Sequence, residues 1–137
     1  MPNKRYVRRH VEFLTVQEMQ ALLRAPDGST WIGRRDHAVL TIALQTGLRA
    51  SEFVNLRCCD VVLQTGAHVR CEGKGRKRRA TPLKGETVTV LNNWLKERRG
   101  SAYDPLFPTM RGDKMSRDAL EYLVKRHIKT ASASAVR

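Results

Sequence analysis

The segment from His37 to Gly47, "HAVLTIALQTG", constrains the fold more than any other part of the chain. One threonine interrupts an apolar run from Ala38 to Leu44, without the alternation that marks a half-buried strand. A helix that is apolar nearly all round has to be enclosed by other elements. Gly47 then ends it, because glycine adopts the left-handed conformation that commonly closes a helix. The sequence therefore predicts a central helix over residues 35–45.

Amphipathic stretches on both sides of this segment predict the helices that enclose it. Thr15 is expected to cap the first, with Glu18 completing a capping box. A short helix follows the glycine turn, a longer one covers residues 86–100, and Ser116 caps a last helix through about Lys129. The residues expected to face the core are Val16, Met19, Leu22 and Leu23 in the first helix, Phe53, Val54 and Leu56 in the short helix, Val88, Leu91, Trp94 and Leu95 in the next, and Leu120, Leu123, Val124 and Ile128 in the last.

Three strand-like segments lie between the short helix and the helix that follows it. They are residues 60–64, 67–72 and 78–83, with a turn at Thr65-Gly66 and a second turn in "GKGRK". The predicted fold class is therefore α+β, mainly α, with helices packed around a small three-stranded antiparallel sheet.

One domain is expected from the length of 137 residues. Residues 1–12 are interpreted as a basic arm or linker. Residues 131–137 are small, polar and unpatterned, which predicts an unstructured tail. The folded domain is then expected to cover residues 13–130.

The charge of the chain is strongly positive. Lysine and arginine number 26 against 13 aspartate and glutamate residues, a formal net charge of +13. So large a surplus in one domain indicates a polyanionic partner, nucleic acid above all. A basic surface that only keeps the protein soluble is the alternative, but here the charge is clustered. In the arm, Arg8 and Arg9 are candidates for phosphate contacts, with a disordered tail as the alternative.

The cysteines and the N-terminal sequence indicate the cellular compartment of the protein and whether it binds a metal ion. Cys58, Cys59 and Cys71 show no zinc-type spacing, and free thiols in a reducing cytosol are favoured over a zinc site built from Cys58, His68 and Cys71. No metal is therefore expected. The charged N-terminus lacks a following apolar region, and no apolar run approaches the length of a membrane span. A soluble, cytoplasmic protein without a membrane partner is predicted.

The stretch "TGLRASE", residues 46–52, carries the first candidate site. Gly47 permits a tight turn that places Arg49 at the start of a helix with its side chain free to project. A guanidinium there offers a planar fork suited to two phosphate oxygens. Glu52 lies one helical turn further and can orient that guanidinium or a neighbouring group. An ordinary surface ion pair between the two residues is the alternative.

The stretch "CEGKGRKRRATPL" carries the second. Two glycines flank Lys74, so the tip of the hairpin can approach another surface closely. A basic β-ribbon suits entry into a DNA groove, and a lysine ammonium can protonate a leaving oxygen. A basic turn that serves solubility is the alternative. A Walker-type phosphate loop is excluded because the spacer between the glycines and the following Ser/Thr are missing. The cations proposed to contact DNA here are Arg76, Lys77, Arg78 and Arg79.

Together these stretches resemble the tyrosine recombinases, the phage integrase family. The segments "FLTVQEMQALL", "RDHAVLTIALQTGLRASEFVNLRCCDV", "GKGRKRRATPL" and "PLFP" follow one another in the order typical of that family, over roughly residues 11–130. The resemblance implies the front part of the catalytic fold of these enzymes, so that residues 13–130 would be a partial catalytic domain.

The resemblance also implies roles for three residues. Arg49 matches the first catalytic arginine, which binds the scissile phosphate and stabilises charge in the transition state. Lys74 matches the hairpin lysine, which acts as general acid toward the 5′-hydroxyl leaving group. Glu52 matches an acidic position that supports the active site without touching the phosphate. The implied reaction is transesterification through a 3′-phosphotyrosyl link, and it needs no cofactor.

The family pattern continues with a His-x-x-Arg motif, a further His or Trp and a nucleophilic tyrosine, none of which is matched in this sequence. Of the tyrosines, Tyr6 lies in the arm, Tyr103 in a link, and Tyr122 is predicted to pack mid-helix. His127 is interpreted as a helix-face histidine. The chain is therefore expected to be a fragment, inactive alone and prone to self-association or to pairing with full-length recombinase subunits.

The predicted function is that of a DNA-binding fragment of a site-specific tyrosine recombinase, with double-stranded DNA as partner and no small-molecule substrate. The alternative is a naturally truncated, non-catalytic DNA-binding or regulatory module that competes or pairs with a full-length recombinase. An unrelated RNA-binding domain is disfavoured, because the chain lacks the aromatic-rich strand motif on which such sheets stack bases.

Overall fold

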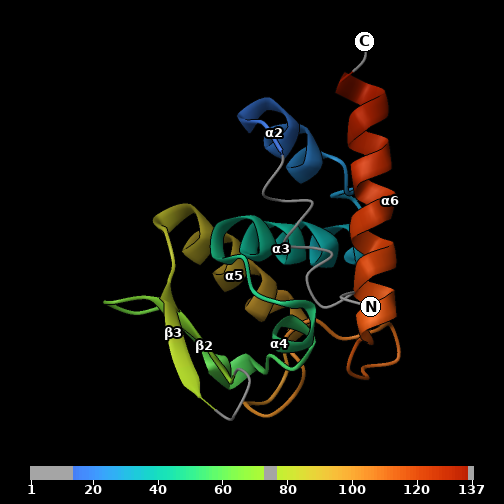
Figure 1. The fold of residues 1–137 in the computed structure, drawn as a ribbon. Coiled ribbons are helices and arrows are strands. Elements are labelled where there is room, and N and C mark those ends of the chain that lie inside the picture. Colours follow the sequence, from blue (N-terminus) through green and yellow to red (C-terminus); the bar gives the residue numbers. More distant parts are fainter. Residues whose placement is uncertain (1–13, 73–76, 136–137) are drawn as a thin grey trace.

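The computed structural model describes residues 14–72 and 77–135 as helices packed around a central helix, with a small sheet at one side (Figure 1). Helix α3 (Trp31–Thr46) lies in the middle. Helix α6 (Arg117–Ala135) runs along one side with α2 (Val16–Arg24) against it, and α5 (Gly85–Arg98) packs against α3. The predicted fold class, mainly helical with a three-stranded antiparallel sheet, is confirmed.

The central helix is as deeply enclosed as its composition predicts. Ala38, Val39 and Ile42 are fully buried, and Gly47 closes the helix with φ +63°. The helix begins earlier than expected, because the Thr30 hydroxyl accepts a hydrogen bond from the Gly33 N–H at 2.9 Å and caps a first turn before residue 35.

A close backbone contact fixes the entry to α3. A Cβ built on Gly33 would lie 1.7 Å from the carbonyl oxygen of Asp27, so only glycine fits there. The same carbonyl accepts the Thr30 hydroxyl at 3.1 Å. The loop from Asp27 to Thr30 therefore lies directly against the first turn of the helix.

Helix α2 has the predicted start, but one of its residues is placed differently. Thr15 and Glu18 form the capping box, with reciprocal hydrogen bonds of 3.1 and 2.9 Å. Leu22 is buried, whereas Val16, which was expected in the same stripe, is 66% exposed. Six positions at 100° per residue place Val16 about 120° around the helix from Leu22, away from the buried face.

The sheet consists of β1 (Val61–Val62), β2 (His68–Glu72) and β3 (Arg78–Pro82), antiparallel in the order β1-β2-β3. Along β2, Val69 and Cys71 face inward and their neighbours face outward. Cys71 pairs with Arg79 and Glu72 pairs with Arg78. Because directly opposed residues share one face of a sheet, Arg79 lies on the inner side and Arg78 on the outer side.

Helix α5 presents Leu91 and Trp94 to the core, and both are buried as predicted. The Trp94 Nε1–H donates to the Leu106 carbonyl at 2.8 Å, which ties α5 to the link that follows it. The expected stop at Gly100 is one residue late, since Arg99 takes the left-handed position with φ +54°. This is an unfavourable conformation for a residue with a Cβ.

Helix α6 begins as predicted, with the Ser116 hydroxyl accepting a hydrogen bond from the Ala119 N–H at 3.0 Å. Two predictions about it are wrong. The helix continues past Lys129 to Ala135, because no Gly or Pro interrupts an alanine-containing sequence, and Ala131 is buried. Residues 131–135 are therefore helical rather than an unstructured tail. Tyr122 is 69% exposed and does not pack into the core.

A buried network joins α3 to α6. Asp36 accepts two hydrogen bonds from Arg35, at 3.0 and 2.9 Å, and lies 2.8 Å from His127 Nε2. The Arg35 Nη1 also donates to the Pro108 carbonyl at 3.0 Å. Asp36 and His127 are both buried, so the histidine expected on a helix face is a partner in the core. The network fixes α6 and the link before it to the central helix.

In the described ranges, no helix combines the length and apolar character needed to cross a membrane.

Candidate nucleic-acid interface

Arg49 is held in a short turn between α3 and α4 (Ala50–Val54). Its neighbours Leu48 and Ala50 are both buried, which anchors the backbone on either side, while the Arg49 side chain stays half-buried. Its own backbone is extended, with φ −70° and ψ 152°. The predicted placement of Arg49 at the start of a helix is therefore observed.

Glu52 fixes that backbone. Its Oε1 accepts the Arg49 N–H at 2.9 Å, as a carboxylate three residues into a helix can do for the residue that caps it. Glu52 is buried, with only 8% of its surface exposed. Glu52 thus contacts the main chain of Arg49, and the positive charge that compensates its carboxylate comes from another residue.

That cation is Arg79, from the hairpin strand β3. Its Nη2 lies 2.9 Å from Glu52 Oε1, and its Nε donates to the Cys71 Sγ at 3.4 Å. The Cys71 thiol in turn lies 3.8 Å from Glu52 Oε2. The hydrogen bond with Cys71 is the main cause that raises the pKa of Arg79, and the Glu52 charge adds to it against partial burial. Burial is the main cause that raises the pKa of Cys71.

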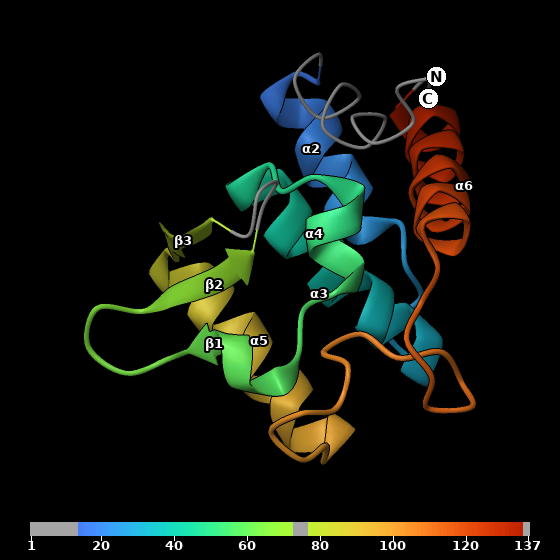
Figure 2. The ribbon, with the colours of Figure 1, turned by 60° about the horizontal axis from the view of Figure 1, so that its bottom comes forward.

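These contacts bring the two predicted stretches together. Figure 2 shows the C-terminal end of β2 directed toward α4, so the hairpin and the Arg49 turn meet at one place. Lys77 and Arg78 are exposed beside them. Lys74 and Arg76 at the hairpin tip, and Arg8 and Arg9 in the arm, lie outside the described residues.

A wide groove of about 990 Å³ borders the same place. Four cations lie on its walls: Arg57, Arg70, Arg78 and Lys114. Arg78 belongs to the predicted basic run, whereas the other three were not predicted, because they are far apart in the sequence and only the fold gathers them. Some are oriented by the protein, since Arg70 donates to the Cys59 carbonyl and Lys114 to Asn55 Oδ1 at 2.7 Å. Three carboxylates, Glu52, Asp60 and Glu72, also line the groove, so its walls carry charges of both signs.

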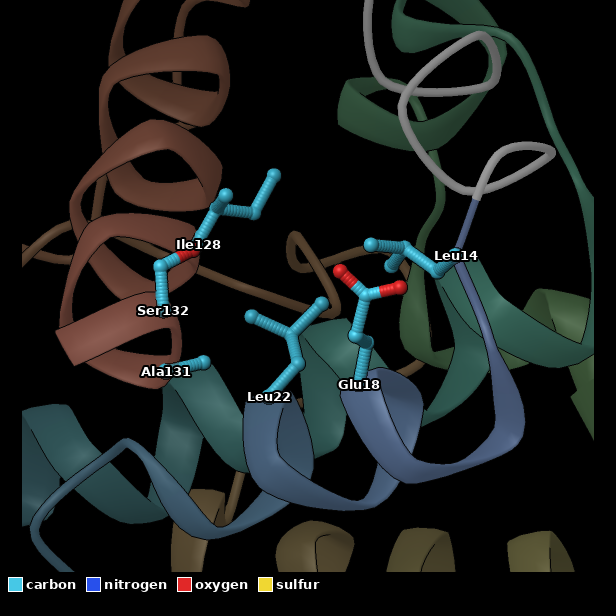
Figure 3. Close-up of a pocket in the computed structure, with 6 residues that line it drawn as sticks. All are labelled: Leu14, Glu18, Leu22, Ile128, Ala131 and Ser132. Atoms are coloured by element: carbon cyan, nitrogen blue, oxygen red, sulfur yellow. The ribbon is translucent and has the colours of Figure 1, made fainter. Parts of the chain in front are cut away.

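A small cavity between α2 and α6 does not offer a second site (Figure 3). It measures about 20 Å³, room for about one water molecule, and its walls are mostly apolar. Over the part of the chain that the structure describes, no three His, Cys, Asp or Glu side chains are grouped to hold a metal ion. The three cysteines are free thiols.

The chain is similar to known proteins over most of its length. The model of the phage integrase family matches residues 12–136. The protein y4rC of Sinorhizobium fredii, which carries an integrase/recombinase name, is 50% identical over 133 residues, 97% of this chain. The tyrosine recombinase XerD of Pseudomonas putida is 37% identical over 123 residues, 86% of this chain. The chain spans 40% and 41% of the lengths of these two relatives.

Solved structures show the same fold. The XerA recombinase superposes with a TM-score of 0.75 at 28% identity, over 88% of this chain and 42% of that one. The XerH site-specific recombinase, solved with its difH substrate before cleavage, gives 0.73 at 28% identity, over 87% of this chain and 36% of that one. A lambda integrase fragment bound to DNA, at 18% identity and a TM-score of 0.63, shares the fold.

Proposed function

The chain belongs to the phage integrase family, and on that premise we propose that it is the DNA-binding front part of a tyrosine recombinase catalytic domain. The observation that carries the proposal is the junction of the Arg49 turn with the basic hairpin strand, through Glu52 and Arg79. An arginine with an anchored backbone beside a cluster of exposed cations suits a phosphate of duplex DNA.

The proposed roles rest on the family of the chain and, for Arg49, Lys77 and Arg78, also on where each group lies. Arg49 contacts the scissile phosphate with its guanidinium and stabilises the charge that develops on the phosphate oxygens. Lys77 and Arg78 neutralise neighbouring phosphates, as Arg8, Arg9 and Arg76 would from outside the described residues. Lys74, also outside them, is the proposed general acid, which passes a proton to the leaving 5′-oxygen.

In the whole enzyme the proposed reaction is a strand exchange in two transesterifications. A tyrosine oxygen bonds to phosphorus as the bond to the 5′-oxygen breaks, and a 5′-hydroxyl of a partner strand then reverses the step. This chain would bind and orient the phosphate, and the nucleophile would come from elsewhere. The XerH complex, in which a relative holds its DNA substrate, supports duplex DNA as the partner.

Binding of short duplex DNA by the Arg49→Ala variant tests the proposal. We expect a loss of affinity of about tenfold or more, because charge-assisted hydrogen bonds contribute about 1.5–3 kcal/mol. The slope of log K against log salt should fall by about one, the value for one lost phosphate contact. Arg24→Ala, an exposed arginine in the last turn of α2, removes the same charge elsewhere and is the matched control. Equal losses in both variants would contradict the proposal.

A further inference from the structure

Arg79 is the cation that links the hairpin to the Arg49 turn, and we propose that it is a positioning residue for Arg49 rather than a phosphate contact. This inference rests on the proposed function, in which Arg49 grips a DNA phosphate. It also assigns Arg79 a different task from that of its neighbours Lys77 and Arg78, which the sequence places in the same basic run.

The contacts of Glu52 carry the inference. A single carboxylate oxygen, Oε1, accepts both the Arg49 N–H and the Arg79 Nη2, each at 2.9 Å. A buried carboxylate is costly unless a positive charge and hydrogen bonds compensate it. Arg79 supplies that charge, so Glu52 can stay inside and hold the Arg49 backbone. Loss of Arg79 would favour a shift of Glu52 toward solvent, and the Arg49 N–H would lose its acceptor.

The sheet register explains why Arg79 and not Arg78 has this position. Arg79 is paired with the inward-facing Cys71, whereas Arg78 is paired with the outward-facing Glu72. The Arg79 guanidinium is further held by the Cys71 Sγ at 3.4 Å. With one nitrogen on the thiol and one on the carboxylate, the fork is oriented into the protein. The side chain is 50% exposed, but two of its three guanidinium nitrogens are bound to protein groups before DNA arrives.

A double-mutant cycle between Arg49→Ala and Arg79→Ala, read as affinity for short duplex DNA, tests the inference. Arg79→Ala should lower the affinity of the parent about threefold or more, the range of coupling between residues that share a partner. In the Arg49→Ala background it should have almost no effect, because the residue it positions is gone. Arg78→Ala, the adjacent exposed arginine, should weaken binding equally in both backgrounds.

The outcomes separate this inference from the proposed function. If Arg79→Ala costs the same affinity with and without Arg49, Arg79 contacts DNA on its own and the inference is overturned while the function stands. If Arg49→Ala itself leaves affinity unchanged, both are overturned. A general loss of folding would lower DNA binding in both backgrounds and would show in the thermal midpoint.

Two further variants keep the test decisive if Arg79→Ala folds poorly. Arg79→Lys keeps a positive charge beside Glu52 but lacks the planar guanidinium. It should lower DNA affinity less than Arg79→Ala does, and this loss of affinity should vanish in the Arg49→Ala background. Glu52→Ala removes the acceptor that Arg49 and Arg79 share. Adding Arg79→Ala to Glu52→Ala should cost no further affinity if Arg79 acts through Glu52, and should still weaken binding if Arg79 is a phosphate contact.

Discussion

Removal of the Asp36 carboxylate is expected to destabilise the protein far more than the loss of a neighbouring exposed ion pair. Asp36 is 3% exposed and serves Arg35 through one oxygen and His127 through the other. Asp36→Ala leaves both partners in the interior without their acceptor. Breaking a buried charged set in this way costs about 3–5 kcal/mol. Because Arg35 keeps its bond to the Pro108 carbonyl, we expect the lower end, about 3 kcal/mol.

An exposed ion pair between α3 and α5 provides the matched control. Arg34, next to Arg35, pairs with Glu97 at 2.6 Å, but the two side chains are 43% and 30% exposed. Glu97→Ala should therefore leave stability nearly unchanged, since exposed pairs are solvated and screened. Asp36→Asn keeps an acceptor in the same place and should lie between the two alanine variants.

Equilibrium urea denaturation at neutral pH measures the effect. The urea midpoint of Asp36→Ala should fall markedly, while the slope of the unfolding free energy against urea concentration stays similar. An unchanged slope shows that stability has changed and not the surface exposed on unfolding. An Asp36→Ala midpoint as high as that of Glu97→Ala would refute the reasoning, because it would mean that the network does not hold α6 against α3.

Two further predictions follow from close packing. Gly33→Ala should lower the free energy of unfolding by about 2 kcal/mol or more, because its Cβ would lie 1.7 Å from a backbone oxygen. Gly28→Ala, with open space around it, should leave stability nearly unchanged. The urea midpoints of the two variants test this, and equal midpoints would contradict it. Burial raises the pKa of Cys71, so at neutral pH less of it is thiolate, and iodoacetamide should label it much more slowly in the folded than in the unfolded chain, faster as pH rises. Mass spectrometry of the labelled peptides checks this, and equal rates would contradict it.

The parts of the fold that depend on nearby residues were predictable from the sequence. The capping box of Thr15 and Glu18, the Ser116 cap and the Gly47 stop all act over four residues or fewer, so their residue types indicate their geometry. The all-round apolar composition of α3 likewise predicted its central position. The end of α6 was not predicted, because a polar, alanine-containing tail has no apolar pattern that marks it as helical. The burial of Ala131 depends on tertiary packing, which the sequence does not show.

The parts of the site that depend on distant residues were not predictable in the same way. The position of Arg49 follows from the glycine turn, but the partner of Glu52 depends on the strand register, which places Arg79 opposite Cys71. Asp36 and His127 meet across 91 residues, and neither has a local signal for the other. The strict alternation of β2 was the one available indication that two neighbouring arginines in β3 face opposite sides.

A chemical-shift map of the isotopically labelled chain, titrated with short duplex DNA, tests the central claim most directly. If Arg49 grips a phosphate beside the hairpin, the largest changes in backbone amide signals should cluster at residues 47–52 and 77–79, and the Arg49→Ala variant should lose those at 47–52. Large changes confined to α2 or α5, with residues 47–52 unaffected, would contradict the account.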